Sequence, residues 1–142
     1  MEPRRRVYCD VAQTILMIDV MTKRLRIIIA DDEPDVREFF SRILTRIGHD
    51  VVASASNGRE LVELSRQHQP DLVIADVRMP EMDGDVAIHE ICRVRPTPFI
   101  MISAYSKPTS LPNSLGTVAS AYLAKPVKWE DLETAIQTMF PQ

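Results

Sequence analysis

Short runs of consecutive apolar residues, followed by turn-forming residues, are the feature that most constrains the fold of this chain. The segment 71–75, with sequence DLVIA, shows no polar alternation, which is typical of a strand buried on both faces. Turn-forming residues 79–84, with sequence MPEMDG, follow it. We therefore expect Asp76 at the carboxyl end of a central parallel strand, the edge at which open α/β sheets bind ligands.

Four further segments rich in apolar residues predict strands, and apolar residues at helical spacing lie between them. This alternation predicts a doubly wound α/β fold, a five-stranded parallel sheet with helices on both faces. Prolines in segment 105–120 predict that any helix there is short or irregular, because a proline inside a helix costs about 3 kcal/mol. The predicted strands are 25–30, 49–55, 71–75, 99–102 and 121–124, and the predicted helices are 34–47, 58–68, 85–95 and 129–140.

Local patterns predict how some side chains of these elements are placed. Apolar residues at helical spacing, Phe39 and Val86 among them, are expected to pack against the sheet. Asn57 is expected to cap the helix that follows it, because a glutamate stands three residues further on, as in a capping box. His49 and His68 lie at the ends of predicted elements, where we expect them to be solvated.

The length of 142 residues predicts one domain with a single core, without a separate catalytic or effector domain. Residues 1–24 do not continue the alternating pattern, and we expect them to form an N-terminal extension. The domain itself is predicted to cover residues 25–142. Met21 stands directly before the first predicted strand and is an alternative start of the protein.

Composition argues against several classes of partner. The formal net charge of −3 and the pI near 5.6 do not suit a binder of nucleic-acid phosphates. No run reaches the ~20 apolar residues that a membrane-spanning helix needs. Cys9 and Cys92 have neither disulfide-framework nor zinc-ligand spacing, so we expect free thiols in a reducing cytoplasm. The sequence predicts a cytoplasmic protein that binds neither nucleic acid nor membrane.

Residues that follow parallel strands gather at one edge of a sheet. The pattern therefore brings together three carboxylates, a hydroxyl and an ammonium, on Asp31, Asp32, Asp76, Ser103 and Lys125. Carboxylates at close range repel one another, and they stay ionised together only with cations among them. Lys125 supplies one positive charge. Oxygen ligands without sulfur or imidazole suit Mg²⁺ as the second cation.

Four segments of the chain carry a resemblance to a known family. They are IIIADDEPD, DLVIADVRMPEMDG, MISA and YLAKPV, and they occur in this order between residue 25 and about residue 140. Together they resemble the receiver domain of two-component response regulators. The resemblance implies a flavodoxin-like (βα)5 fold with strand order 2-1-3-4-5 and a cis peptide bond between Lys125 and Pro126.

The same resemblance implies a phosphorylation and metal site. Asp76 matches the phosphoacceptor of the family. Asp32 and Asp76, with the backbone carbonyl of Arg78, match the groups that bind Mg²⁺, and Asp31 matches a residue that acts through a metal-bound water.

Further positions match the parts of the family that hold the phosphoryl group and respond to it. Ser103 and Lys125 match residues that contact phosphoryl oxygens, and Ser103 with Tyr122 matches the switch pair that moves on phosphorylation. Arg78 and Tyr105 match positions that tune how long the acyl phosphate lasts. We expect a lifetime at least as long as in fast chemotaxis regulators.

The resemblance predicts a stand-alone receiver that accepts a phosphoryl group from a histidine kinase or a histidine phosphotransfer protein and signals through contacts with another protein. We expect a monomer or weak homodimer that catalyses its own phosphorylation and dephosphorylation without turning over a separate substrate. Two alternatives are a phosphorylation-independent interaction module and an Asp-nucleophile phosphohydrolase of small molecules. The sequence identifies neither the kinase, nor the downstream partner, nor the process regulated.

Overall fold

The computed structural model describes residues 23–104 and 118–141. Within these residues no helix has both the length and the apolar character needed to cross a membrane. Strands and helices alternate from residue 26 to residue 103. The elements are β1 (Arg26–Ala30), α2 (Pro34–Arg46), β2 (Asp50–Ala55), α3 (Gly58–His68), β3 (Leu72–Asp76), α4 (Gly84–Val94), β4 (Phe99–Ser103), β5 (Ser120–Ala124) and α5 (Trp129–Met139).

Some sequence predictions fall outside the described residues. They concern the N-terminal extension up to residue 22 with Cys9, and the proline-rich segment 105–117 with Tyr105. These predictions are not tested by the structure.

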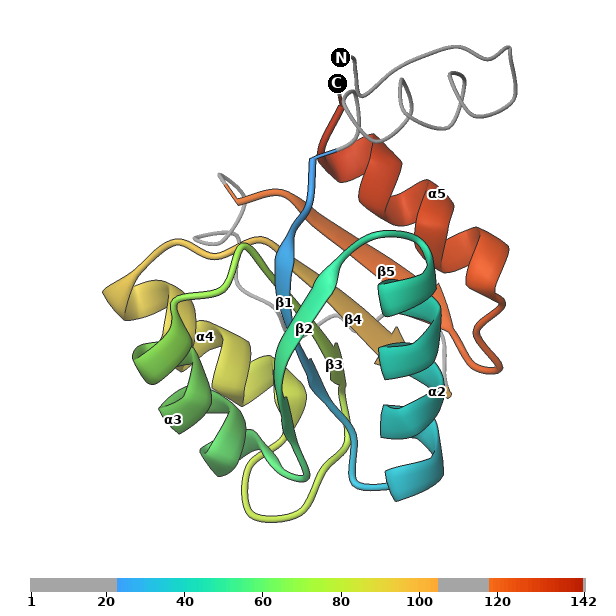
Figure 1. Ribbon diagram of the computed structural model, residues 1–142. Coiled ribbons are helices and arrows are strands. Elements are labelled where there is room, and N and C mark those ends of the chain that lie inside the picture. The colour runs from blue at the N-terminus through green and yellow to red at the C-terminus, as the bar shows by residue number, and fades with distance from the viewer. Residues whose placement is uncertain (1–22, 105–117, 142) are drawn as a thin grey trace, which may run out of the picture.

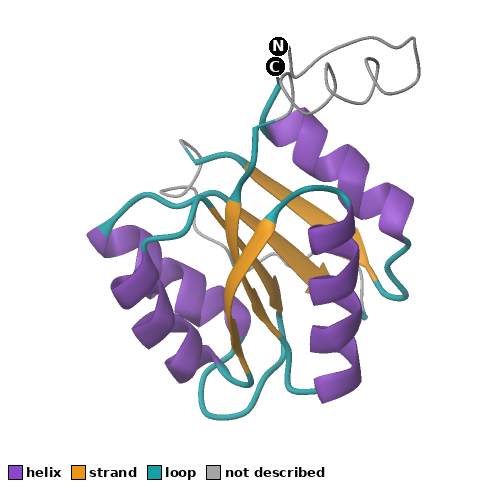
Figure 2. Ribbon diagram, viewed as in Figure 1, coloured by secondary structure: helices purple, strands orange, loops and turns teal. Residues whose placement is uncertain are grey.

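The five strands form one parallel sheet in the order β2-β1-β3-β4-β5. Helices α2 and α5 cover one face of the sheet, and α3 and α4 cover the other (Figure 1). Figure 2 shows the same arrangement, with the purple helices on both sides of the orange strands. The predicted doubly wound fold and its strand order are confirmed, and the carboxyl ends of all strands share one edge.

Two hydrophobic cores fill the space between the sheet and its helices. Every residue of β3 and of β4 is buried, as their apolar runs predict. The core under α3 and α4 includes Ile28, Val73, Leu61, Ile88 and Met101, and the core under α2 and α5 includes Ile27, Ile74, Leu44, Ile102 and Leu132. Helices therefore cover both faces of the sheet, and polar groups can lie at the carboxyl ends of its strands.

Turn and cap residues set the ends of the helices. Asn57 caps α3, because its side-chain oxygen accepts a hydrogen bond of 2.8 Å from the backbone of Glu60, as predicted. The carboxylate of Glu60 reaches back to the backbone N–H of Ser56 at 2.7 Å, one residue before the cap. Gly48 follows α2 with a φ of +102°, a left-handed conformation that glycine adopts without strain.

Two apolar residues that were expected to face the sheet are exposed. Val86 is 50% exposed, and Phe39 is 42% exposed. Successive residues turn by about 100° around a helix, so Val86, two positions before buried Ile88, lies on the far side of α4. Phe39 directly precedes buried Phe40, so it lies about 100° away around α2, at the edge of the buried stripe.

The prediction that His49 is solvated is wrong. His49 is buried directly before β2, and its Nδ1 accepts a hydrogen bond of 3.1 Å from the backbone N–H of Leu25. Burial lowers the pKa of His49, and the nearby charge of Arg24 lowers it further. At neutral pH the imidazole is therefore uncharged in the folded protein, and its Nδ1 serves as a hydrogen-bond acceptor.

Burial of neutral His49 predicts a loss of stability in mild acid. Its pKa is lower in the folded state than in the unfolded chain, where it is about 6.5, so protonation favours unfolding as the pH falls through that value. His49→Asn keeps an acceptor but does not titrate. We expect urea unfolding at pH 7.5 and pH 5.5 to show a larger loss of stability for the parent than for the variant. Equal losses would contradict this role of His49.

Candidate functional site

Three aspartates meet at the carboxyl edge of the sheet. Asp31 and Asp32 follow β1, and Asp76 is the last residue of the neighbouring strand β3. One carboxylate oxygen from each lies within 4.8 Å of those of the other two. Asp31 and Asp76 are buried, whereas Asp32 is exposed. The sequence prediction that these carboxylates gather is confirmed by this geometry.

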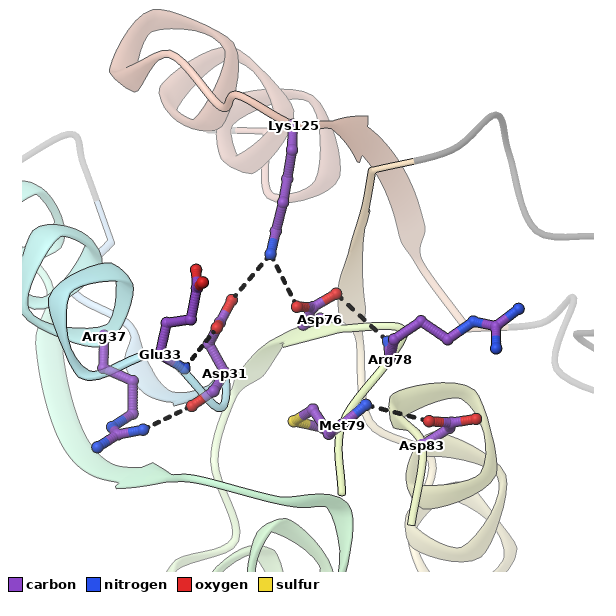
Figure 3. Close-up of polar contacts among 8 residues, drawn as sticks. All are labelled: Asp31, Glu33, Arg37, Asp76, Arg78, Met79, Asp83 and Lys125. Carbon is purple, nitrogen blue, oxygen red and sulfur yellow. Dashed lines mark hydrogen bonds and ion pairs between the residues drawn. The ribbon is translucent and has the colours of Figure 1, made fainter. Parts of the chain in front are cut away.

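Lys125 brings a positive charge into the same site. It follows β5, and its Nζ lies 2.8 Å from Oδ2 of Asp76 and 3.4 Å from Oδ2 of Asp31 (Figure 3). Its backbone N–H donates to the carbonyl oxygen of Ser103 at 2.8 Å, which ties the end of β5 to the end of β4. The peptide bond between Lys125 and Pro126 is cis, as predicted.

The backbone around Asp31 is fixed by hydrogen bonds. Its N–H donates to the carbonyl oxygen of Ala55 at 3.1 Å, and its Oδ1 accepts from the backbone N–H of Glu33 at 2.9 Å. Its Oδ2 is buried and accepts no hydrogen bond from the described residues, although the ammonium of Lys125 lies within ion-pair distance. A buried carboxylate oxygen therefore points into the site with acceptor capacity left over.

Burial and charge act in opposite directions on the groups of this site. Burial raises the pKa of Asp31, and the charge of Asp76 raises it further, while the N–H of Glu33 and the ammonium of Lys125 oppose the shift. Burial lowers the pKa of Lys125, but its hydrogen bond to Asp76 and the charges of both aspartates outweigh burial and leave this pKa raised. Lys125 is therefore charged at neutral pH, and burial makes ionisation of Asp31 costly.

The loop between β3 and α4 is built tightly against Asp76. The backbone N–H of Arg78 lies 3.3 Å from Oδ1 of Asp76, and the N–H of Met79 donates to Oδ1 of Asp83 at 3.0 Å (Figure 3). Gly84 begins α4 so close to the carbonyl oxygen of Asp76 that a Cβ there would overlap it. Glycine is thus required at residue 84 by close approach of the backbone.

The other predicted site residues lie around this centre. Ser103 is buried at the end of β4, in register with Ala124 of β5. Tyr122 is partly buried in β5, packs against the core under α3 and α4, and has a pKa raised by burial. The side chain of Arg78 is exposed and extends away from Asp76 (Figure 3).

Two supporting residues were not found by sequence reasoning. The guanidinium of Arg37 donates to the backbone carbonyl oxygen of Asp31 at 2.7 Å, a contact with the main chain that no sequence spacing indicates. Asp83, interpreted from the sequence only as a turn residue, also holds the N–H of Met79. The Asp-Gly pair at the start of α4 was the available signal for that turn.

The residues of this edge fit a hard divalent cation. The donor set is three carboxylates with oxygen atoms only, which suits Mg²⁺ better than a metal that prefers sulfur or imidazole. Oδ2 of Asp31 supports the fit, because this buried oxygen has an ion pair with Lys125 but no hydrogen bond from the described residues.

Comparison with known proteins assigns the family. A family model described as the response regulator receiver domain matches residues 27–137. The chain belongs to this family. The receiver domain is a component of two-component systems, and receiver domains bind Mg²⁺ at an acidic pocket, which here corresponds to the cluster of Asp31, Asp32 and Asp76.

Relatives of this receiver include regulators and chemotaxis proteins. It is 39% identical over 112 residues to the transcriptional regulatory protein PdtaR of Mycobacterium tuberculosis, covering 79% of this chain and 55% of PdtaR. It is 37% identical over 112 residues to the chemotaxis protein CheY of Bacillus subtilis, covering 78% of this chain and 93% of CheY. The chain thus spans about half the length of PdtaR and nearly all of that CheY.

A solved structure supports the same fold. The crystal structure of the CheX–CheY–BeF3–Mg²⁺ complex from Borrelia burgdorferi contains a chain that matches this receiver with a TM-score of 0.75. The two chains are 26% identical, and the match covers 82% of this chain and 90% of the other.

The raised pKa of Asp31 predicts that this carboxylate destabilises the metal-free protein at neutral pH. A raised pKa in an acid means that folding favours the protonated form, so ionisation above the usual pKa costs stability. We expect Asp31→Asn to raise the free energy of unfolding at pH 7 by about 1 kcal/mol, or the melting temperature by about 4 °C, in the presence of EDTA.

Asp32→Asn is the matched control for this prediction, because Asp32 is exposed and has no side-chain partner among the described residues. Its melting temperature without metal should stay close to that of the parent. A destabilised Asp31→Asn protein would contradict the electrostatic account of the site.

Proposed function

We propose that this receiver accepts a phosphoryl group on Asp76 in an Mg²⁺-dependent reaction. The observation that carries the proposal is the position of the Lys125 ammonium between the carboxylates of Asp76 and Asp31. A cation placed there balances charge at the point where phosphoryl oxygens would arrive. Family membership and the likeness to a CheY crystallised with BeF3 and Mg²⁺ support the same conclusion.

The proposed chemistry is a phosphoryl transfer from phosphohistidine. A carboxylate oxygen of Asp76 attacks phosphorus in line, the P–N bond breaks as the O–P bond forms, and the imidazole leaves and takes up a proton. Lys125 neutralises charge on the phosphoryl oxygens, and the hydroxyl of Ser103 contacts one of them. Water later hydrolyses the acyl phosphate on Asp76 at the same site.

The cation ligands would be Asp32, Asp76 and the backbone carbonyl of Arg78, with Asp31 acting through a water. When bound, Mg²⁺ supplies further positive charge for the phosphoryl oxygens. The backbone N–H of Arg78 and the hydrogen bonds of Asp31 hold the protein ligands in place. The ammonium of Lys125 lies within ion-pair distance of two of these carboxylates, Asp31 and Asp76, and offsets part of their mutual repulsion.

Phosphorylation is proposed to be read through Ser103 and Tyr122. Ser103 ends β4 and is tied to Lys125 through the backbone, and Tyr122 lies in β5 opposite Met101. A phosphoryl group adds charge and acceptor oxygens beside Ser103. The receiver would signal by a shift between two populated conformations that a partner distinguishes.

The proposed partners are a histidine kinase or histidine phosphotransfer protein as donor, and a downstream protein as target. We propose a monomer or weak homodimer in the cytoplasm, with residues 25–142 as the signalling unit and no turnover of a separate substrate. The phosphoryl lifetime expected from Arg78 and Tyr105, at least as long as in fast chemotaxis regulators, stays a prediction.

The proposal predicts one Mg²⁺-dependent phosphoryl group per chain. We expect intact mass after incubation with acetyl phosphate to show a single added phosphoryl group for the parent, and none for Asp76→Asn or in EDTA. Asp85→Asn, in the first turn of α4 and outside the acidic cluster, is the control and should label like the parent.

Other outcomes distinguish the alternatives. Failure to label with both acetyl phosphate and a donor kinase would favour a phosphorylation-independent interaction module. Steady turnover of a chromogenic phosphomonoester would favour a phosphohydrolase. Labelling of Asp76→Asn at the parent level would overturn the assignment of the acceptor.

A further inference from the structure

Arg37 is the basic side chain that reaches the acidic loop from α2. It lies in the first half of the helix, is partly buried, and its Nη1 donates to the backbone carbonyl oxygen of Asp31 at 2.7 Å (Figure 3). The guanidinium contacts the main chain of the loop and not one of its carboxylates. Its contact therefore acts on the backbone geometry of the site.

The peptide unit that Arg37 holds is shared with Asp32. A peptide bond is planar, so fixing the carbonyl of Asp31 also fixes the amide plane from which Asp32 extends. Within the described residues the carboxylate of Asp32 has no hydrogen bond or ion pair of its own. Its direction therefore depends on the backbone, which is held on one side by Arg37 and on the other by the start of α2 at Pro34.

The other two carboxylates of the cluster are held by hydrogen bonds of their own. The carboxylate of Asp76 accepts from the ammonium of Lys125 and the backbone N–H of Arg78, and that of Asp31 accepts from the backbone N–H of Glu33. Asp32 is thus the member of the cluster whose position is least constrained by its own contacts. A cation ligand held only through its backbone is the one most affected when that backbone is loosened.

We propose that Arg37 is a positioning residue, which orients the carboxylate of Asp32 toward a divalent cation by holding the carbonyl of Asp31. The inference rests on the proposed function, since it concerns the Mg²⁺ site of the same edge. Arg37 touches neither the cation nor the phosphoryl group, and its role is exerted through the Asp31–Asp32 peptide.

Positioning and simple electrostatics predict effects of opposite sign. Removal of a positive charge near a cation site strengthens cation binding if only Coulomb repulsion matters. Loss of the hydrogen bond to Asp31 lets the Asp31–Asp32 peptide rotate. The Asp32 carboxylate then occupies several orientations, which weakens cation binding. The sign of the change in Mg²⁺ affinity therefore separates the two explanations.

The test is a Mg²⁺ titration of the full chain, in which amide chemical shifts in NMR spectra report binding. Arg37→Met keeps an apolar stem but removes both donor and charge, and we expect it to weaken Mg²⁺ binding about tenfold. Arg37→Lys keeps a donor and the charge and should recover part of the affinity. Arg42→Met removes an exposed charge from the same helix, where Arg42 pairs with Glu38, and should bind Mg²⁺ like the parent.

A second measurement separates an effect on Mg²⁺ binding from an effect on phosphoryl transfer. The rate of labelling by acetyl phosphate should fall for Arg37→Met at low Mg²⁺ and return to the parent rate when Mg²⁺ is saturating. Thermal unfolding in EDTA shows any loss of stability that the variant has without Mg²⁺.

Parent-like or tighter Mg²⁺ binding by Arg37→Met would overturn the proposal, even if the variant unfolds at a lower temperature. A labelling defect that persists at saturating Mg²⁺ would also overturn it, because it would assign Arg37 to the transfer step. Failure of the parent itself to bind Mg²⁺ would instead refute the proposed function. The two failures are therefore distinguishable.

Discussion

The site depends on the ammonium of Lys125 lying between two buried carboxylates. Oδ2 of Asp76 is 2.8 Å from Nζ, and Oδ2 of Asp31 is 3.4 Å from it. Like charges at this range cannot all stay ionised in a buried site without a cation. The strand order explains why a lysine is used: β4 separates β5 from β3, so the group that follows β5 must reach across the end of β4. A long flexible stem that ends in a compact charge meets this requirement.

The rest of the edge keeps the acidic groups in place at some cost to stability. Burial raises the pKa of Asp31, and its Oδ2 is left with acceptor capacity that the described residues do not fill. Hydrogen bonds to the main chain offset this cost. Arg37 holds the loop between β1 and α2, and Asp83 holds the loop between β3 and α4. Gly84 allows α4 to begin against the carbonyl of Asp76. Burial of apolar side chains in the cores on both faces of the sheet stabilises the fold and compensates for the cost of this site.

Much of this arrangement could be predicted from the sequence, because parallel strands have a characteristic pattern. Runs without polar alternation located the strands within one or two residues, and residues at their carboxyl ends had to share an edge. The buried side of a helix was harder to predict, as Val86 shows, because its rotation is set by packing against neighbours. The burial of His49 and the contact of Arg37 involve backbone atoms from other elements. Hydrogen bonds between a side chain and the main chain of another segment leave no periodic signal in the sequence.

A crystal structure of this protein with bound beryllofluoride and Mg²⁺ would show directly whether Asp76 accepts a phosphoryl group beside Lys125. Beryllofluoride mimics a phosphoryl group on a carboxylate. We expect beryllium bound to a carboxylate oxygen of Asp76, Nζ of Lys125 in contact with fluoride, and a metal ion touching Asp32 and Asp76. An unmodified Asp76, or a metal ion bound away from the three aspartates, would contradict this expectation.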